Sequence, residues 1–587
     1  MFIKYFIQLL KQFNGGFKRQ ISWLFIMSVI SGFLELLGIA MIFPCILLLT
    51  SEKTPLGETI IAYCSKFLPN SSHIEIAFFF SIIMVCVFLF KNLFMMYSIK
   101  EQNKFVKKWS DYVSQDVIKK VLYAPYKSLS KLTYGDKNTL LFSIVREISL
   151  NFVLRCIILL ANGVVAFCIL LLLFYKFTIP AFLSILFIVA YAFLENNFFK
   201  SKAKKLGEEG IELLNDFALG VNFIIESQKE IVISNKQEYF SNYLLSKTKN
   251  ISDNFQKQIS YGNYPLHVTE IGVILAFLIM MSSIVFMDNV SKTAIVSSLA
   301  VIALIVLRLV PQLNKVLISM YSINVVKQQV IWFLEKYDEI SKFGYEEFKN
   351  IPKMKFEEKI ELKDLSFSYD DEESLSNINL TINKGEFVGI IGASGAGKTT
   401  LADIISGVYL KDSGEFLVDG VKIERENLPS FQKNISFLPQ QSIFLNDVVL
   451  KNVAFGICDK DIDIDRAKAA LIKAGLDIDV NSSMDLSYGQ KQRVALARAY
   501  YRDFEILILD EMTASLDVNS EIEVVQNVSK LKGEKTIIAI AHRLSTLKNC
   551  DKIVYLVDGK IKAVGTFDEL RQKYSEINQM IAISSFD

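Results

Sequence analysis

The chain has 587 residues, of which 51% are hydrophobic, and its mean hydropathy is +0.33. It is too long for one ordinary domain and too apolar for a purely soluble protein, so membrane-spanning segments must be considered first. The formal net charge of +2 gives no indication of nucleic-acid binding. The cysteines are scattered without C-x-x-C spacing, which argues against a disulfide framework and against a zinc site.

Long apolar runs are confined to the first 325 residues, and each approaches the roughly 20 residues that a helix needs to cross a bilayer. They predict a transmembrane domain over residues 1–335 with six spanning helices, near 21–50, 74–99, 152–175, 177–194, 271–287 and 293–323. The loops after the second and fourth spans are rich in lysine. By the positive-inside rule these loops and both termini are expected to be cytoplasmic.

Charged residues that fall inside these spans include Glu35, Lys91, Arg155 and Arg308. A charge within a membrane span is costly, so each one indicates either pairing inside the helix bundle or contact with a substrate. Both interpretations stay open. The candidates for substrate contact are Glu35, Lys91 and Arg308, and the two cations would suit a substrate that carries phosphate.

Beyond the spans the chain changes character. Residues 336–358 are a mixed-charge stretch typical of a solvated linker, and residues 359–587 alternate short β-rich runs with helical ones. Such alternation favours an α/β domain with a parallel, nucleotide-binding sheet. The predicted fold class is therefore an α-helical six-span membrane domain fused to an α/β P-loop domain.

The stretch GASGAGKTT, residues 392–400, fits the P-loop pattern and stands between an apolar strand and a helix. Its glycines allow backbone N–H groups to turn towards an anion, and the helix N-terminus adds the positive end of its dipole. Lys398 would reach the β and γ phosphates of ATP, and Thr399 would ligate Mg²⁺. The residues predicted to contact nucleotide here are Gly392, Ser394, Gly395, Ala396, Gly397, Lys398, Thr399 and Thr400.

A second apolar strand, ILILDE over residues 506–511, ends in two carboxylates. Asp510 is expected beside the P-loop, where it would hold Mg²⁺ through water. Glu511 would then face the nucleophilic water as the candidate general base.

With LSYGQKQR at residues 486–493, these motifs stand in an order and spacing that resemble the ATP-binding-cassette (ABC) ATPase domain over residues 360–575. The resemblance implies that Tyr369 stacks on adenine, Gln440 senses Mg²⁺, and Asp517 and His542 are the D-loop and switch residues. It also implies that Ser487, Gly489 and Gln490 bind the γ phosphate held by a second subunit. Tyr488 replaces a signature glycine. Because that position contributes mainly backbone, we predict a working signature, with a degenerate one as the alternative.

Six spans followed by one such ATPase resemble an exporter half-transporter. Three short strings, LFKNLF (89–94), SQKEIVISNKQEYF (227–240) and LRLVPQLNKV (307–316), are similar to the bacterial branch that flips lipid-linked oligosaccharides. The resemblance implies a homodimeric, multi-pass flippase of the bacterial inner membrane that uses ATP and Mg²⁺ in alternating access. The alternatives are an exporter of peptides, lipids or hydrophobic drugs, and a membrane ATP switch that transports nothing. The spans argue against a soluble ABC ATPase acting on nucleic acid, and the fusion of both domains in one chain argues against an importer.

Overall fold

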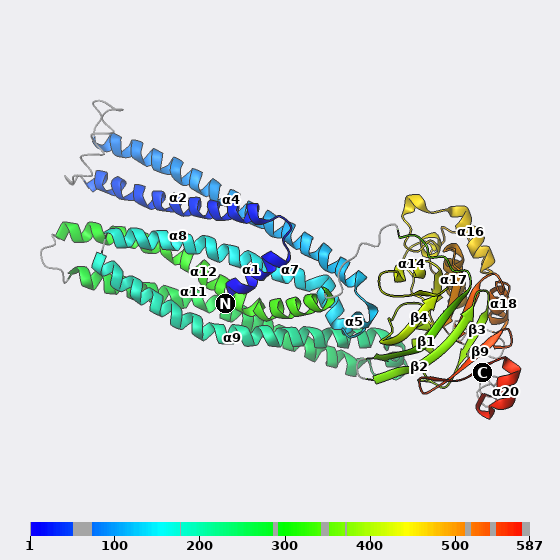
Figure 1. The fold of residues 1–587 in the computed structure, drawn as a ribbon. Coiled ribbons are helices and arrows are strands. Elements are labelled where there is room, and N and C mark those ends of the chain that lie inside the picture. The colour runs from blue at the N-terminus through cyan, green and yellow to red at the C-terminus, as the bar shows by residue number, and fades with distance from the viewer. Residues whose placement is uncertain are drawn as a thin grey trace. The chain divides into compact units, whose positions relative to one another are not determined.

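The computed structural model describes residues 2–50, 73–176, 178–285, 292–341, 351–369, 372–510, 518–540 and 547–577. The chain forms two compact units. The helical unit comprises residues 1–124 and 128–345, and the sheet-containing unit comprises residues 125–127 and 346–587. The long helices of the first unit and the strands of the second are drawn in Figure 1.

The helical unit consists of long helices joined by short ones. Four of the long helices have 49 to 51 residues each, and at 1.5 Å per residue such a helix is about 75 Å long, more than twice the roughly 30 Å of a bilayer's hydrocarbon core. Only part of each can therefore lie in lipid. The long helices are α2 (Lys18–Thr50), α4 (His73–Tyr123), α8 (Leu154–Lys176), α9 (Thr178–Glu226), α11 (Gln237–Val285) and α12 (Lys292–Ser341). The shorter elements are α1 (Phe2–Gln12), α5 (Tyr126–Ser130), α6 (Tyr134–Asn138), η1 (Thr139–Ser143), α7 (Ile144–Ile148), η2 (Ser149–Val153) and α10 (Gln228–Ile233).

Among the described residues, four helical segments are long and apolar enough to cross a membrane: Lys18–Gly38, Phe78–Tyr123, Tyr134–Leu171 and Gln237–Ser282. They contain the predicted spans 1, 2, 3 and 5 in whole or in part. The remaining predicted spans, 177–194 and 293–323, fall partly on residues whose side chains lie outside the described set.

The core of the helical unit joins distant parts of the chain through aromatic rings. Phe13, which follows α1, lies edge-on to Trp109 of α4, with ring centroids 6.2 Å apart, and stacks on Phe333 of α12 at 5.9 Å. Helices α9 and α12 approach so closely that a Cβ atom at Gly207 would collide with the carbonyl of Val325. A glycine at this position lets the two backbones meet.

The described residues of the sheet-containing unit form two sheets. The antiparallel one has the strand order β2-β1-β4-β5, built from β1 (Lys359–Tyr369), β2 (Glu372–Asn383), β4 (Ser413–Val418) and β5 (Val421–Lys422). The other has the order β10-β9-β3-β8-β7-β6, in which every neighbouring pair but β10·β9 is parallel. Its strands are β3 (Phe387–Ile391), β6 (Ile435–Leu438), β7 (Ile506–Asp510), β8 (Thr536–Ile540), β9 (Lys552–Val557) and β10 (Lys560–Gly565).

Strands β3 and β8 are buried at every residue. This explains why their sequences are apolar throughout instead of alternating between apolar and polar residues. The helices of this unit are α13 (Lys398–Ile405), α14 (Leu428–Gln432), α15 (Val449–Val453), η3 (Asp459–Asp461), α16 (Ile464–Lys473), α17 (Tyr488–Tyr501), α18 (Val518–Ser529) and α20 (Phe567–Lys573). The predicted α/β domain with a parallel sheet is confirmed.

Candidate functional site

The register of the parallel sheet places the two phosphate-site motifs at the same edge. Ile390 of β3 and Asp510 of β7 both pair with Ile540 of the strand between them, β8. The loop that leaves β3 and the carboxylate that ends β7 are therefore at the same level. Ligands of open α/β sheets bind at this edge, outside the carboxyl ends of the strands.

The loop between β3 and α13 can be built only with glycine at two of its positions. Gly397 has a φ of +93°, and a Cβ atom there would lie 2.8 Å from Cδ2 of Leu375. At Gly392 a Cβ atom would collide with the carbonyl of Leu556. Any larger residue would strain the turn or push it away from its neighbours.

Lys398 is the first residue of α13, and only 7% of its surface is exposed. Its ammonium group donates hydrogen bonds to the carbonyls of Gly392 and Ala393, at 3.0 and 2.9 Å. The positive charge of Lys398 therefore lies inside the turn. Gly397 caps α13 without a side-chain hydrogen bond, so the first N–H groups of the helix have no side-chain cap to compete with an anion. The loop forms a cradle for phosphate oxygens.

The two threonines that follow Lys398 have different surroundings. Thr399 is exposed, as a ligand of a bound ion must be, whereas Thr400 is buried. The Thr400 hydroxyl lies 3.3 Å from the Tyr369 hydroxyl and accepts a hydrogen bond from Ser374 at 3.1 Å. Thr400, which the sequence places among the nucleotide contacts, therefore ties α13 to β1 and β2. Tyr369 keeps 37% of its surface exposed, which leaves ring area for a base.

A carboxylate that the motifs do not include also faces this edge. Burial and the nearby charge of Asp510 raise the pKa of Asp403 to about 6. Two acidic groups this close repel each other, and a cation beside them would relieve the repulsion. The sequence signal for Asp403 is its position one turn after Thr399 on the same face of α13.

The residues predicted to hold Mg²⁺ offer oxygen donors, namely the Thr399 hydroxyl, the Asp510 carboxylate and the Gln440 amide, and Asp403 adds a second carboxylate near Asp510. Oxygen is the ligand atom that this ion prefers. The described residues contain no cluster of three or more His, Cys, Asp or Glu side chains that could hold a metal. These donors fit an ion that keeps several waters and is held mainly by substrate phosphates, as Mg²⁺ commonly is.

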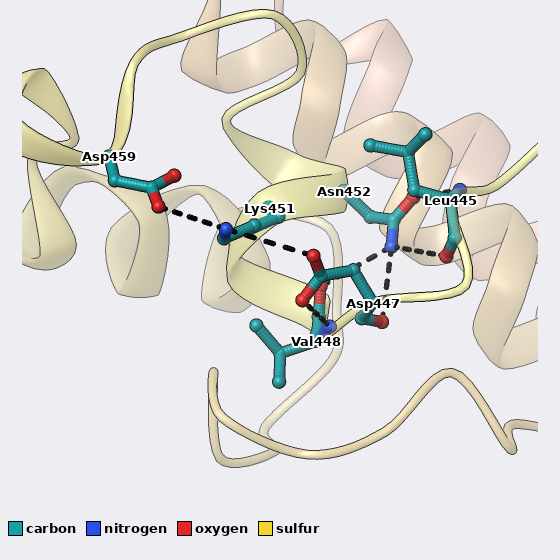
Figure 2. A network of polar contacts seen from close by, with 6 residues as sticks. All are labelled: Leu445, Asp447, Val448, Lys451, Asn452 and Asp459. Atoms are coloured by element: carbon teal, nitrogen blue, oxygen red, sulfur yellow. Dashed lines mark hydrogen bonds and ion pairs between the residues drawn. The ribbon is translucent and has the colours of Figure 1, made fainter. Parts of the chain in front are cut away.

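Gln440 is exposed and begins the segment 440–452. Asn452 of α15 fixes the other end of this segment (Figure 2). Asn452 is fully buried, and its side chain donates to the carbonyls of Leu445 and Val448 at 3.0 and 3.3 Å. The same amide accepts a hydrogen bond from the Leu445 N–H at 2.8 Å. One side chain thus fixes the backbone of the turn. No motif marks Asn452 in the sequence.

The signature motif forms the start of α17. Ser487 is the N-cap, where its hydroxyl accepts from the Gln490 N–H at 3.3 Å and its own N–H donates to the Gln490 side chain at 2.9 Å. This reciprocal pair is a capping box. Tyr488 is 48% exposed, so its ring does not fill the interior, and Gly489 follows within the first regular turn.

Within one chain the signature and the P-loop rest on different elements. Helix α17 packs on α15, α16 and β6, while α13 packs on β2, β7 and β8. Arg498 of α17 donates from Nε to the carbonyl of Asn452 at 2.9 Å, and its guanidinium lies 4.5 Å from the ring centroid of Phe455. Burial lowers the pKa of Arg498. This side chain links the signature helix to the turn that follows Gln440.

The structure brings together the three charged residues predicted as candidates for substrate contact. Lys91 of α4 lies 2.7 Å from the Glu35 carboxylate of α2, and Arg308 of α12 lies 3.6 Å from it. The ring centroid of Phe88 is 5.2 Å from both cations. Glu35, Lys91 and Arg308 form what we call the ion-pair cluster.

Three further residues predicted for the ATP site, Glu511, Asp517 and His542, lie outside the described residues.

Comparison with known proteins shows which sequences and which fold this chain resembles. Residues 375–514 match the family model described as ABC transporter. The chain is 41% identical over 236 residues to an ATP-dependent lipid A-core flippase of Syntrophus aciditrophicus, which covers 38% of this chain and 39% of that protein. It is 38% identical over 229 residues to the heterocyst differentiation ATP-binding protein HepA of a Nostoc species, covering 37% of this chain and 38% of that protein.

The matched part thus spans about two fifths of the length of these curated relatives. Over almost the whole chain, the fold is similar to that of a bacterial Atm1-family ABC exporter solved with ATP bound. The TM-score is 0.77 at 19% sequence identity, and the match covers 97% of this chain and 98% of that one. The predicted exporter fold is confirmed.

Proposed function

We propose that this protein, which carries an ABC transporter domain on the fold of an ABC exporter, uses ATP hydrolysis to move an amphipathic substrate across the bacterial inner membrane. In this proposal residues 1–335 form the translocation pathway, residues 336–358 are the linker and residues 359–587 are the ATPase. Both termini are on the cytoplasmic side.

The observation that carries the proposal is the position of Lys398. Its buried ammonium group lies inside a glycine turn at the start of a helix, and Asp510 ends a strand at the same level of the sheet. A cation, open helix N–H groups and a carboxylate at one edge are what binding of Mg²⁺-ATP requires.

The residues then have the following roles. Lys398 binds the β and γ phosphates, Thr399, Gln440 and Asp510 hold Mg²⁺, and Tyr369 stacks on the base. The ion, when bound, offsets the charge that develops on the phosphate oxygens. Glu511 acts as general base towards the attacking water, and His542 contacts the γ phosphate.

A second copy of the chain completes the site. Because α17 and α13 rest on different elements of one chain, Ser487, Gly489 and Gln490 would meet the ATP held by a partner's P-loop. We therefore propose a homodimer with two ATP sites. ATP binding closes the dimer and opens the pathway outward, and hydrolysis with release resets it.

For the substrate we propose a lipid-linked oligosaccharide. Support comes from the relatives named as lipid A-core flippases and from the cationic side chains of Lys91 and Arg308 within the helical unit. The alternative substrates are peptides, other lipids and hydrophobic drugs. A membrane ATP switch without transport is the remaining alternative.

The test measures ATP hydrolysis by the purified full-length protein in nanodiscs. We expect Lys398→Ala and Glu511→Gln to abolish hydrolysis, whereas Lys460→Ala, which changes an exposed lysine of the same unit, leaves it unchanged. A polyprenyl-diphosphate oligosaccharide should stimulate hydrolysis more than a peptide or a hydrophobic drug does. Hydrolysis that survives Lys398→Ala would contradict the ATP site, and stimulation by peptide alone would contradict the substrate.

A further inference from the structure

Tyr369, the side chain predicted to stack on adenine, ends β1 and is contacted both at its hydroxyl and at its ring. The hydroxyl lies 3.3 Å from the Thr400 hydroxyl of α13. The ring lies edge-on to Phe367 and to Tyr409, with ring centroids 5.0 and 5.3 Å away. A tyrosine side chain has two χ angles, so contacts at both ends of the ring leave it little rotational freedom.

Tyr409 is itself held in place. It is 6% exposed and stands four residues beyond the end of α13. Its N–H donates to the carbonyl of Asp403, in the last turn of that helix, at 3.3 Å. The Tyr409 ring also packs on Phe367, which is fully buried, with centroids 5.1 Å apart. Tyr409 therefore presents a fixed ring to Tyr369.

A segment far away in the sequence adds a further ring to this group. Tyr126 belongs to the sheet-containing unit, and its ring centroid lies 5.5 Å from that of Tyr409. Tyr409 thus contacts three other aromatic rings, those of Tyr126, Phe367 and Tyr369. Aromatic pairs of this kind add stability beyond the area that they bury.

The backbone beside Tyr369 is fixed separately. The Ser368 N–H donates to the Asp412 carboxylate at 2.7 Å, and the Lys127 ammonium lies 3.1 Å from the same carboxylate. That ammonium also lies 4.8 Å from the ring centroid of Phe367. With the backbone held in this way, the orientation of the Tyr369 ring depends on the side chains that contact it.

A ring that is oriented before the ligand arrives favours the binding of a flat base. A ligand that must immobilise a free side chain binds roughly two- to twelvefold more weakly for each such side chain. Tyr369 keeps 37% of its surface exposed, so ring area remains for a base. The gain from its fixed orientation applies only to ligands that carry a base, and not to phosphate groups in the cradle of the P-loop.

We propose that Tyr409 is a positioning residue for the nucleotide base. Its ring holds the Tyr369 ring in the orientation that stacks on adenine, and Tyr409 acts through Tyr369 and not through the phosphates. This role deepens the proposed function and rests on it, since it requires a base on Tyr369.

The experiment measures binding of Mg²⁺-ADP and of Mg²⁺-diphosphate to the full-length protein in nanodiscs by isothermal titration calorimetry. Diphosphate lacks the base, so the ratio of the two dissociation constants reports what the base contributes. The variants are Tyr409→Leu, Tyr409→Phe, Tyr369→Leu and the double variant Tyr369→Leu/Tyr409→Leu. The matched control is Phe431→Leu, which removes another buried ring of the same hydrophobic core, one that lies edge-on to Phe416.

We expect Tyr409→Leu to weaken ADP binding about fivefold and to leave diphosphate binding unchanged. Tyr409→Phe keeps the ring and should bind ADP as the wild type does. Tyr369→Leu should weaken ADP binding at least as much as Tyr409→Leu, and the double variant should bind ADP no more weakly than Tyr369→Leu. Phe431→Leu should keep the wild-type ratio. In ATP hydrolysis, Tyr409→Leu should raise KM about fivefold with kcat unchanged, because only binding is affected.

Unchanged ADP affinity in Tyr409→Leu would overturn the proposal, and so would an equal loss for diphosphate, which would indicate general damage to the site. ADP binding by Tyr409→Phe as weak as by Tyr409→Leu would overturn the role of the ring. Weaker ADP binding by Tyr369→Leu alone contradicts only the positioning role. An unchanged ratio in Tyr369→Leu contradicts the base contact on which that role rests. A wild-type protein that binds neither ADP nor diphosphate contradicts the proposed function itself.

Discussion

Replacing Lys91 with methionine tests whether the ion-pair cluster stabilises the helical unit. Glu35 is 3% exposed, and its nearest cation, at 2.7 Å, is Lys91. In Lys91→Met the carboxylate would keep only Arg308, at 3.6 Å. Removing one partner of a buried ion pair costs about 3–5 kcal/mol, because the remaining charge stays desolvated. Since Arg308 remains, we expect the lower end, about 3 kcal/mol.

The assay is thermal unfolding of the full chain in nanodiscs, followed by intrinsic fluorescence. Lys91→Met should melt well below the wild type, while Lys108→Met, at an exposed position of the same helix, should not. The double variant Glu35→Leu/Lys91→Met removes the two buried charges and leaves only Arg308, whose side chain is 37% exposed. It should recover much of the loss, since apolar side chains can replace a buried ion pair at little cost. A single variant as stable as the wild type, or a double variant less stable than the single, would refute the reasoning.

Three further predictions concern the sheet-containing unit. Asp403 has its pKa raised from its ordinary value near 3.8 to about 6, so the folded protein holds this proton more tightly than the unfolded chain, and the charged form destabilises the fold above pH 6. Asp403→Asn should therefore raise the melting temperature at pH 7.5 but not at pH 4 in Mg²⁺-free buffer; an equal gain at both pH values would contradict this. Asn452→Ala should lower stability by roughly 1–3 kcal/mol and slow ATP hydrolysis, because it frees the turn after Gln440, whereas the exposed Asn481→Ala should do neither. Tyr488→Gly should hydrolyse ATP at about the wild-type rate, and a large increase would show that the tyrosine obstructs the signature.

The phosphate site could be predicted because its determinants are local. A glycine turn between a strand and a helix needs only neighbouring residues, and the capping box of Ser487 and Gln490 spans one turn. The motifs also led us to expect Asp510 beside the loop of Lys398, but the strand order behind this, with β8 lying between β3 and β7, could not be derived from them. Strand order of this kind is set by tertiary packing.

In the helical unit, too, single residues could be predicted from the sequence, whereas their pairing could not. Glu35 and Lys91 stand out in apolar runs, but their pairing joins helices whose relative rotation no single span encodes. Asn452 and Asp403 belong to no motif. Their importance comes from their surroundings, which are the backbone of a turn for Asn452 and the nearby charge of Asp510 for Asp403.

The most direct test of ATP-driven transport is translocation of a polyprenyl-diphosphate oligosaccharide in liposomes that contain the purified protein. The readout is protection of the oligosaccharide from a glycosidase, measured with and without ATP. We predict ATP-dependent movement by the native protein and none by Glu511→Gln. ATP hydrolysis without movement of this lipid would contradict the assigned substrate, and equal movement by Glu511→Gln would contradict transport driven by ATP hydrolysis.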